Sequence, residues 1–326
     1  MSDRWGICAS ILDAIGDTPL VALDRLTAGL EGRILAKIEF FSPGLSKKDR
    51  IARRIILDAR ACGDLAPGQP VIELTSGSTG TGAAIACAVL GHPFIAVMSA
   101  GNSLERAVMM RGLGAEVVVV PQADGVAPGT VTGADLVRVE AETVRLTAQR
   151  GAFRIDQFKR RGALSAHEDG TGAELWRQSA GAVTAFCDFV GSGGAFAGVS
   201  RALKSADPRV RTYIVEPEGA AVLAGSEASR PAHKIQGGGY VMPDLPLLEG
   251  APVDGYLTVS DVDAEDAARR LAREEGIFAG YSAGANLAAA LALLRGPERG
   301  GVIAILICDS GLKYLSTDLW REAGIT

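Results

Sequence analysis

The chain has few aromatic side chains, no clustered cysteines and no long apolar stretch. Aromatic residues make up 5% of the 326 residues although 48% are hydrophobic, so the core is expected to be mainly aliphatic. A composition rich in alanine and glycine but poor in aromatics is typical of helices packed on a parallel sheet. No apolar segment is as long as a membrane-spanning helix, and the first ten residues lack the basic and apolar regions of a signal peptide.

Excess basic charge and metal-binding patterns are also lacking. The formal net charge is −5, which gives no reason to expect a nucleic acid or an anionic membrane as partner. The cysteines are widely spaced and form no CxxC pair: Cys8, Cys62, Cys87, Cys187 and Cys308. This spacing is typical of free thiols in a reducing compartment and disfavours disulfides or a zinc site. We therefore expect a soluble cytoplasmic enzyme without a bound metal.

Predicted strands and helices alternate along the chain, with a Gly-, Pro- and Thr-rich surface loop over 121–135. In the first half, strands are predicted over 33–41, 70–74, 93–99 and 115–120, and helices over 47–63, 83–91, 103–114 and 136–150. In the second half, strands are predicted over 182–194 (ending in a glycine turn), 210–217 and 300–311, and helices over 263–276 and 284–294. This alternation predicts an α/β fold with mainly parallel sheets, arranged as two lobes around a ligand-binding cleft.

Two adjacent lysines, Lys47 and Lys48, stand at the start of the predicted helix over 47–63. At helical spacing, Lys48 shares a face with three apolar residues, Ala52, Ile55 and Ala59. Lys47 shares its face with a mixed set, Ile51, Arg54 and Asp58. We therefore expect Lys48 to point toward packed surface and Lys47 toward solvent.

An inward lysine in the first turn of a helix has an unusual environment. Both the positive helix end and the loss of water disfavour the ammonium form, and a neutral amine can act as a nucleophile. The alternative is that Lys48 only extends past its apolar neighbours to solvent, and the rarity of catalytic lysines favours this alternative when the helix is considered alone.

Four glycine-rich turns favour a chemical role for Lys48 over a purely structural one. The segment TSGSTGTG (75–82) lies between a strand and a helix, where its backbone NH groups and hydroxyls form an anion cradle, but it lacks the lysine of a nucleotide-binding P-loop. The segment GSGGAFAG (191–198) predicts a second anion site; Phe196 occupies the third glycine position of a dinucleotide loop, so a nicotinamide cofactor is disfavoured. Two further turns lie at 236–240 and 280–286. Each turn alone is commonly structural, but a lysine with separate phosphate and carboxylate loops is what pyridoxal phosphate chemistry on an amino acid requires.

In order and spacing, these segments are similar to fold-type II pyridoxal-phosphate enzymes of the cysteine synthase (O-acetylserine sulfhydrylase) and cystathionine β-synthase family. The resemblance extends nearly end to end and includes IGDTPLVAL (15–23), LAKIEFFSPGLSKKDRIA (35–52), ELTSGSTGTG (73–82), GLGAEVVV (112–119), DQF (156–158), TGAELW (171–176), VGSGGAFAG (190–198), YIVEPEGA (213–220), HKIQGGG (233–239), GYSAGAN (280–286) and DSGLKYLS (309–316).

The resemblance implies pyridoxal 5′-phosphate as cofactor and a role for each matching residue. Lys48, which precedes Asp-Arg, is implied to form the covalent link to the cofactor and to act in catalysis. The substrate carboxylate is implied to bind Thr75, Ser76, Gly77 and Thr79, assisted by Gln157 and Gly237. Further cofactor contacts are implied for Ser78, Gly191, Ser192, Gly193, Gly194, Ala195 and Ser282, of which Ser282 is implied to hydrogen-bond the pyridine nitrogen.

A neutral hydroxyl at the pyridine nitrogen makes the ring a weaker electron sink, which suits rapid β-elimination. The resemblance thus implies a β-replacement synthase, in which an activated serine such as O-acetylserine or O-phosphoserine loses its leaving group and the resulting aminoacrylate adds sulfide, thiosulfate or another nucleophile. Two alternatives stay open: a β-eliminating dehydratase or lyase, and a catalytically weakened ligand-binding relative. The family also implies a homodimer, a smaller mobile substrate-carboxylate domain over 45–152, and a larger phosphate-binding domain formed by 1–44 with 153–326.

The chain departs from the family pattern in four places. Ser78 replaces the usual asparagine at the cofactor ring, and Ala195 replaces a threonine hydroxyl at the phosphate, a loss of about 1 kcal/mol. The turn QGGGY (236–240) differs from the common GIGAG, and the 121–135 loop is longer than usual. In addition, Lys159, Arg160 and Arg161 follow Gln157; such runs are commonly solvated faces, and the alternative hypothesis is that one of them contacts an anionic donor or acceptor.

Overall fold

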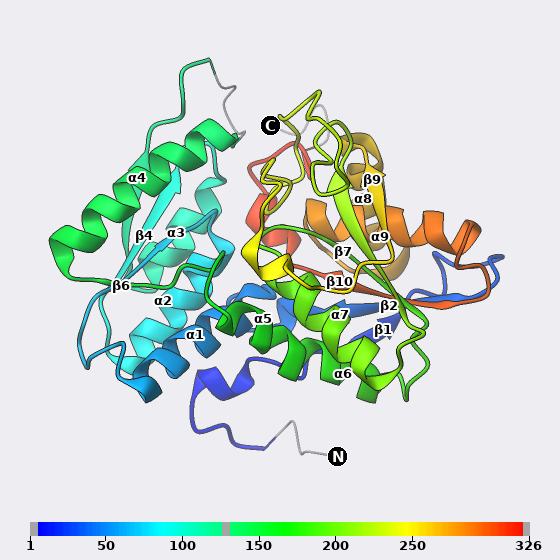
Figure 1. The fold of residues 1–326 in the computed structure, drawn as a ribbon, viewed down its shortest axis with the longest axis horizontal. Coiled ribbons are helices and arrows are strands. Elements are labelled where there is room, and N and C mark those ends of the chain that lie inside the picture. Colours follow the sequence, from blue (N-terminus) through cyan, green and yellow to red (C-terminus); the bar gives the residue numbers. More distant parts are fainter. Residues whose placement is uncertain (1–5, 126–130, 322–326) are drawn as a thin grey trace.

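The structure, a computed structural model, describes residues 6–125 and 131–321 and contains two separate sheets, each flanked by helices (Figure 1). The larger sheet has six strands in the order β1-β2-β10-β7-β8-β9, and only the β1–β2 pair is antiparallel. Its strands are Leu20–Ala22 (β1), Arg33–Ile38 (β2), Val302–Ile307 (β10), Ala185–Phe189 (β7), Arg211–Pro217 (β8) and Gly255–Val259 (β9).

The smaller sheet is entirely parallel and has the order β5-β4-β3-β6. Its strands are Glu116–Val120 (β5), Phe94–Ser99 (β4), Val71–Leu74 (β3) and Phe153–Arg154 (β6). Strand β6 lies just beyond residue 152, where the predicted smaller domain ends. The α/β fold with mainly parallel sheets that the sequence predicts is confirmed.

The helices mostly connect parallel strands, as expected for right-handed crossovers. They are α1 (Lys48–Cys62), α2 (Ser78–Leu90), α3 (Leu104–Gly112), α4 (Gly133–Arg150), α5 (Gly162–Ala166), a π-helical turn (His167–Gly172), α6 (Ala173–Gln178), α7 (Gly194–Ala206), α8 (Asp261–Glu275) and α9 (Tyr281–Arg295). Short 3-10 turns occupy Ile11–Ala14, Glu39–Phe41, Pro246–Leu248 and Gly311–Tyr314. No helix in the described part of the chain has the length and apolar character needed to cross a membrane.

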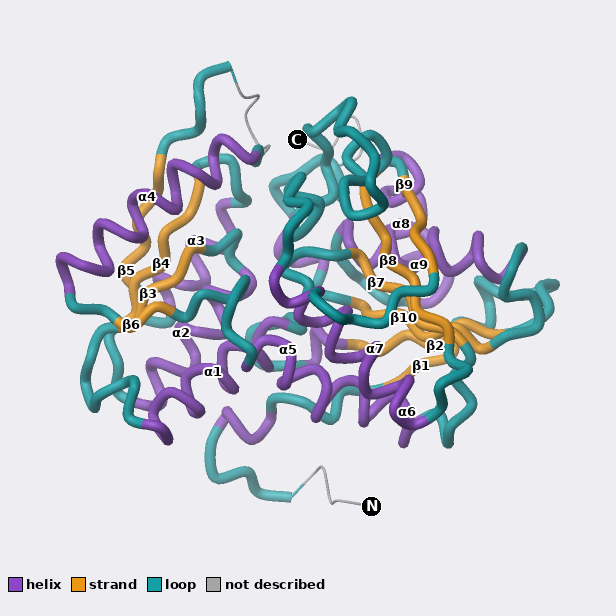
Figure 2. The backbone as a smooth tube through the Cα atoms, in the orientation of Figure 1, coloured by secondary structure: helices purple, strands orange, loops and turns teal. Residues whose placement is uncertain are grey.

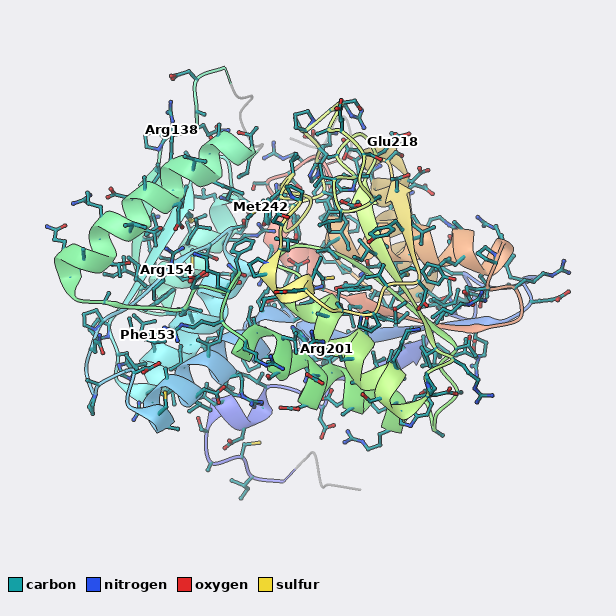
Figure 3. The ribbon with its side chains drawn as sticks, viewed as in Figure 1. Arg138, Phe153, Arg154, Arg201, Glu218 and Met242 are labelled. Atoms are coloured by element: carbon teal, nitrogen blue, oxygen red, sulfur yellow. The ribbon has the colours of Figure 1, made fainter. Side chains whose placement is uncertain are left out.

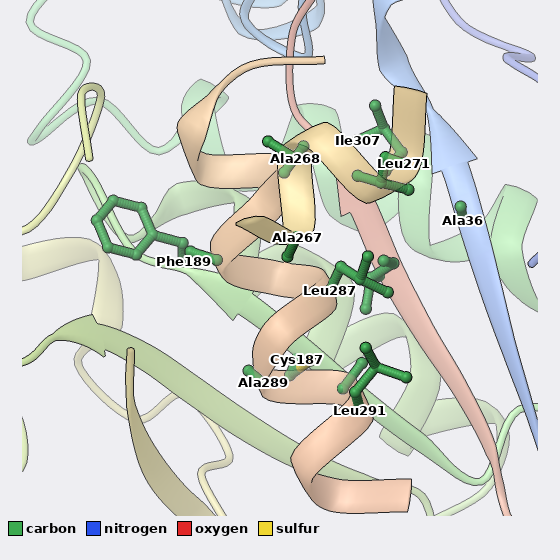
Figure 4. Packing of buried hydrophobic residues seen from close by; sticks show 14 of the residues in the cluster. Ala36, Cys187, Phe189, Ala267, Ala268, Leu271, Leu287, Ala289, Leu291 and Ile307 are labelled. Carbon is green, nitrogen blue, oxygen red and sulfur yellow. The ribbon is translucent and has the colours of Figure 1, made fainter. Parts of the chain in front are cut away.

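Helix α9 occupies the centre of the larger lobe because it is apolar on nearly all sides. It packs on α8 and on the larger sheet, with Leu287, Ala289 and Leu291 in one buried cluster (Figure 4). A side chain at Gly284 would collide with the backbone carbonyl of Ala264 in α8, so glycine allows the two helices to approach closely. Small residues in α9 thus place its N-terminal turn, which carries Ser282, close to the carboxyl ends of the strands.

Two features differ from the sequence predictions. Helix α4 begins at Gly133, earlier than predicted, because Thr132 caps it in a reciprocal capping box with Asp135. The predicted loop over 121–135 lies partly outside the described residues. Strands β1, β6 and β9 were not predicted from the sequence, because they are short or half-exposed. The long connection between β8 and β9 contains a single 3-10 turn (Figure 2).

All five cysteines are free, as predicted; Cys8 and Cys62 are exposed, and the other three are buried.

Candidate active site

A cavity of about 810 Å³, counting its open mouth, lies where loops from both sheets meet. It is formed largely by residues that follow the carboxyl ends of β3, β7 and β10, the usual ligand position in parallel sheets. Most of the predicted site residues line it: Lys48, Ser76, Ser78, Thr79, Gln157, Gly191, Ser192, Gly193, Ala195, Gly237 and Ser282.

Three predicted residues, Thr75, Gly77 and Gly194, stand behind the cavity wall. The Thr75 hydroxyl accepts hydrogen bonds from the backbone NH groups of Gly77 (2.8 Å) and Gly80 (3.0 Å), which fixes the turn. Gly77 has a φ of 118°, and a side chain there would overlap Arg106. A Cβ at Gly194 would lie 2.9 Å from the carbonyl oxygen of Ala163. These residues therefore shape the two loops from behind.

Lys48 is the first residue of α1, is partly buried and faces the cavity, as predicted. Burial and the neighbouring Lys47 ammonium lower the pKa of the Lys48 amine to about 8. Because this value is well below that of an ordinary lysine, the neutral amine is readily accessible near neutral pH. Of the two lysine amines that line the cavity, Lys48 is therefore the one whose pKa favours the neutral form.

The prediction that Lys47 faces solvent is wrong. Its Nζ donates to both carboxylate oxygens of Asp188, at 2.9 and 2.8 Å, and the Lys47 side chain is only 8% exposed. Helical spacing misplaced Lys47 because it precedes the first residue of α1 and is tied to the end of β10, where its NH donates to the Cys308 carbonyl at 2.8 Å. The buried charge of Lys47 is tolerated because the carboxylate of Asp188, which is distant in sequence, pairs with it.

The turn at 191–194 has the features of an anion cradle. It leads into α7, whose N-cap is Gly193, with a φ of 86° and no side-chain cap hydrogen bond. A Cβ at Gly191 would lie 2.5 Å from the carbonyl oxygen of Gly237, so only glycine allows the two turns to meet. The uncapped NH groups at the start of a 13-residue helix are suited to a phosphate. Ala195 lines the cavity but offers no hydroxyl.

The opposite wall is built from hydroxyl and amide groups next to the smaller sheet, together with the Tyr240 hydroxyl from the connection between β8 and β9. The Thr79 hydroxyl donates to Gln157 Oε1 at 2.7 Å, and Gln157 Nε2 donates to the Leu74 carbonyl at 3.2 Å. The Ser76 hydroxyl lies 3.1 Å from the Tyr240 hydroxyl. The Thr79 hydroxyl hydrogen is already used by Gln157, but Gln157 Nε2 has a second hydrogen and the Ser76–Tyr240 pair has one hydroxyl hydrogen left, and these can donate to a small carboxylate.

The comparisons with known proteins agree with this geometry. Residues 11–309 match the family model described as "Pyridoxal-phosphate dependent enzyme". The chain belongs to that family.

Several family members are similar over nearly their whole length. The chain is 38% identical to an O-ureido-L-serine synthase of Streptomyces lavendulae, over 95% of this chain and 92% of that protein. It is 36% identical to cysteine synthase B of Pseudomonas aeruginosa, over 95% and 97%. A crystal structure of O-ureido-L-serine synthase superimposes with a TM-score of 0.86 at 37% identity, covering 98% of both chains. The predicted resemblance to the cysteine synthase family is therefore confirmed.

Pyridoxal phosphate is the cofactor of this family, and the residues present fit it. The cradle at 191–194 would hold the phosphate, Lys48 would supply the amine, and Ser282 would reach the ring nitrogen. Ser282 lies in the first turn of α9, is 6% exposed and is within hydrogen-bond reach of the Cys308 thiol. Ser78 lies between Asp309 Oδ2 and Lys313 Nζ, each at 3.4 Å, so its hydroxyl already has polar partners near the predicted ring position.

Several residues that line the cavity were not predicted from the sequence to belong to the site: Lys47, Arg106, Phe158, Asp188, Tyr240, Cys308 and Asp309. Tyr240 ends the unusual QGGGY turn, and its ring packs edge-on against Phe158 with 6.2 Å between centroids. In the view of Figure 3, the labelled Met242, two residues after Tyr240, lies between helix α4 and strand β9. The altered turn was the available signal, but its direction into the cavity could not be read from the sequence.

The run Lys159–Arg161 does not reach the cavity. Lys159 is 67% exposed and pairs with Asp156, whereas Arg160 lies over the Phe153 ring, 4.3 Å from its centroid (Phe153 is labelled in Figure 3). Arg161 is exposed. Because none of the three belongs to the described lining residues, the structure favours the solvated-face interpretation of this run.

Proposed function

We propose that this chain is a β-replacement synthase that converts a β-activated serine and a nucleophile into cysteine or another β-substituted alanine. The observation that carries the proposal is that the Lys48 amine, the 191–194 cradle and the Ser76–Thr79–Gln157 group all line one cavity in a member of the pyridoxal-phosphate family. A cysteine synthase and an O-ureido-L-serine synthase among the relatives support this reaction class.

Each residue group has a defined task in this proposal. Pyridoxal phosphate, when bound, supplies an aldehyde that condenses with amines and a ring that delocalises the electron pair left at the substrate α-carbon. Lys48 anchors the cofactor, then removes the α-proton as a neutral amine and returns it at the end. Ser76, Thr79 and Gln157 bind the substrate carboxylate, and the neutral Ser282 hydroxyl orients the ring without forcing a charge on it.

The charges in the cavity favour O-acetylserine over O-phosphoserine as donor. Besides Lys48, the cationic lining residues are Lys47 and Arg106, and each already faces a carboxylate: Asp188 at 2.8 Å and Asp309 at 3.9 Å. The described lining therefore offers no second cationic site, beyond the 191–194 cradle, for a phosphate ester. An uncharged acetyl ester needs no such site.

Mixing experiments test the donor and the reaction class together. We expect O-acetylserine to change the cofactor absorbance of the purified protein and O-phosphoserine to do so weakly or not at all. Product analysis with and without sulfide separates a synthase from a lyase, because a lyase releases pyruvate in both cases. In Lys48→Ala, borohydride reduction should leave no pyridoxyl label on the helix α1 peptide; a label on another lysine of the wild-type protein would contradict the proposal.

The architecture and location proposed for the protein follow the family resemblance. We propose that 45–152 moves as a substrate-carboxylate domain against the remainder, that the protein is a homodimer, and that it is cytoplasmic. Light scattering of the purified protein across a dilution series tests the dimer, and a mass equal to one chain would contradict it.

A further inference from the structure

The buried ion pair between Lys47 and Asp188 has no task in the proposed reaction. The two side chains are 8% and 1% exposed and both line the cavity that contains Lys48. Burial opposes the Lys47 ammonium, but the Asp188 carboxylate holds the pKa of Lys47 above its usual value, so Lys47 keeps its positive charge.

Asp188 connects Lys47 to the helix that carries Ser282. Asp188 Oδ1 accepts a hydrogen bond from Asn286 Nδ2 at 3.0 Å, and Asn286 is fully buried one turn after Ser282 in α9. The same amide binds the neighbouring strands: its Oδ1 accepts from the Phe189 NH at 2.6 Å, and its Nδ2 donates to the Leu306 carbonyl at 2.9 Å. Asn286 therefore joins β7, β10 and α9 at the cavity.

The backbone just before Lys48 is held by the end of β10. The Lys47 NH donates to the Cys308 carbonyl at 2.8 Å, Ser46 forms an antiparallel bridge with Asp309, and the Lys48 NH donates to the Ser46 hydroxyl at 3.3 Å. The ion pair adds a side-chain attachment to β7 at Asp188, three residues before the 191–194 cradle begins. One network thus connects the segments of the lysine, the cradle and Ser282.

Stability alone gives a weak reason for such a pair. Removing two charges from water costs about as much as their attraction returns, and apolar residues of similar volume are often equally stable or better. Its position suggests a different use, because it fixes a permanent positive charge beside the reactive amine.

We propose that Lys47, held by Asp188, is a positioning residue for Lys48, and that its charge favours the neutral, nucleophilic form of the Lys48 amine. This inference rests on the proposed function, in which Lys48 binds the cofactor. The titratable groups whose charges affect the pKa of Lys48 are Lys47, Asp188, Cys308 and Glu73. His167 also lies near both lysines, whose charges lower the pKa of its imidazole.

Most of those neighbours are neutral near neutral pH. Burial raises the pKa of the Cys308 thiol to about 12 and that of the Glu73 carboxyl to about 8, and it lowers the pKa of His167. The charges that act on Lys48 are therefore those of the ion pair, and Lys47 acts more strongly than Asp188.

The test measures the titration of Lys48 itself, in full-length protein freed of cofactor. Trace acetylation with acetic anhydride from about pH 6 to about pH 10, followed by peptide mass spectrometry, gives the midpoint at which each lysine becomes reactive. The variants are Lys47→Met, which removes the charge, and Lys47→Arg, which keeps it. Lys204→Met is the matched control, because Lys204 forms a 2.8 Å pair with Asp254 away from the cavity.

In Lys47→Met we expect the Lys48 midpoint to rise by about one pH unit, the usual effect of a nearby charge, and not to move in Lys47→Arg or Lys204→Met. If Lys47→Met fails to fold, the neutral pair Lys47→Met with Asp188→Asn replaces it, and its midpoint also rises because the Lys47 effect is the larger. A purely structural pair predicts a lower melting temperature with an unmoved midpoint.

A second readout separates this inference from the proposed function. Borohydride reduction after brief exposure to pyridoxal phosphate locates the covalent label by peptide mass. If Lys48 carries the label but its midpoint is the same in wild type and both neutralised variants, the inference is overturned. If the label lies on another lysine, the proposed function fails instead.

Discussion

Gly191→Ala is the sharpest perturbation of the predicted phosphate cradle. The added Cβ would lie 2.5 Å from the Gly237 carbonyl oxygen, closer than real Cβ atoms approach backbone. The φ of Gly191 is not in the left-handed region, so alanine introduces a collision without backbone strain. The Cβ position is fixed by the backbone of residue 191 and the Gly237 oxygen belongs to the main chain, so neither atom can rotate away and the 191–194 and 236–240 turns must separate.

Overpacking of this kind costs about 1–3 kcal/mol. In the cofactor-free protein the two turns can move apart, whereas a bound phosphate needs the cradle NH groups to converge. The cost therefore falls mainly on the bound state. We expect the dissociation constant for pyridoxal phosphate to rise by about 5- to 150-fold, since 1.4 kcal/mol corresponds to a factor of ten.

The assay is a titration of cofactor-free protein with pyridoxal phosphate, followed by absorbance, with circular dichroism to verify the fold. Gly112→Ala is the matched control, because this glycine ends α3 and a Cβ there meets nothing within 4 Å. Wild-type cofactor affinity in a folded Gly191→Ala protein would show that the phosphate does not bind at this turn.

Three further predictions concern the substrate wall, acid stability and the basic run. In Tyr240→Phe, loss of the 3.1 Å contact with Ser76 should raise the KM for the donor about 2- to 10-fold at similar cofactor affinity; an unchanged KM would contradict it. Burial opposes ionisation of Glu174, but hydrogen bonds from Arg50 at 2.7 and 2.8 Å hold the pKa of this carboxyl below its usual range. The ionised Glu174 carboxylate therefore stabilises the folded protein above the unfolded pKa of about 4.5, and this stabilisation is lost progressively as the pH falls from there toward the lower folded pKa. The difference in melting temperature between wild type and Glu174→Gln should therefore become smaller below about pH 4. A difference that does not change with pH would refute this prediction. Alanine at all three of 159–161 should leave the donor KM unchanged, and an increase would restore the substrate-contact hypothesis.

The fold could be predicted wherever local pattern and tertiary position agree. The apolar runs that became β4 and β10 are buried on both faces, and the capped amphipathic run of α8 packs its buried face against α9 as its periodicity predicts. Strand β6 has two residues and exists only because β3 offers a free edge, so no local signal marks it. The π-helical turn His167–Gly172 is likewise set by packing against α7 rather than by propensity.

The cavity could be predicted through its glycine turns, because glycine at a strand–helix junction reflects a backbone constraint that stays local. Gly193 is an example: its left-handed backbone is required at the start of α7. Tyr240 and Arg106 could not be predicted in the same way. Their side chains enter the cavity because distant segments meet there, and their contacts with Ser76 join residues 164 and 30 positions apart.

Lys47 and Lys48 show what a local sequence pattern can and cannot predict. The helical spacing of the apolar residues predicted the inward direction of Lys48 correctly, because apolar periodicity indicates the nearest packed surface. The same periodicity predicted wrongly that Lys47 faces solvent, because a local pattern treats every charged residue as unpaired and therefore costly to bury. Asp188, 141 residues later, removes that cost by pairing with it. A buried ion pair between distant residues leaves no trace in the local pattern of either one, so the charge beside the reactive amine is visible only in the folded protein.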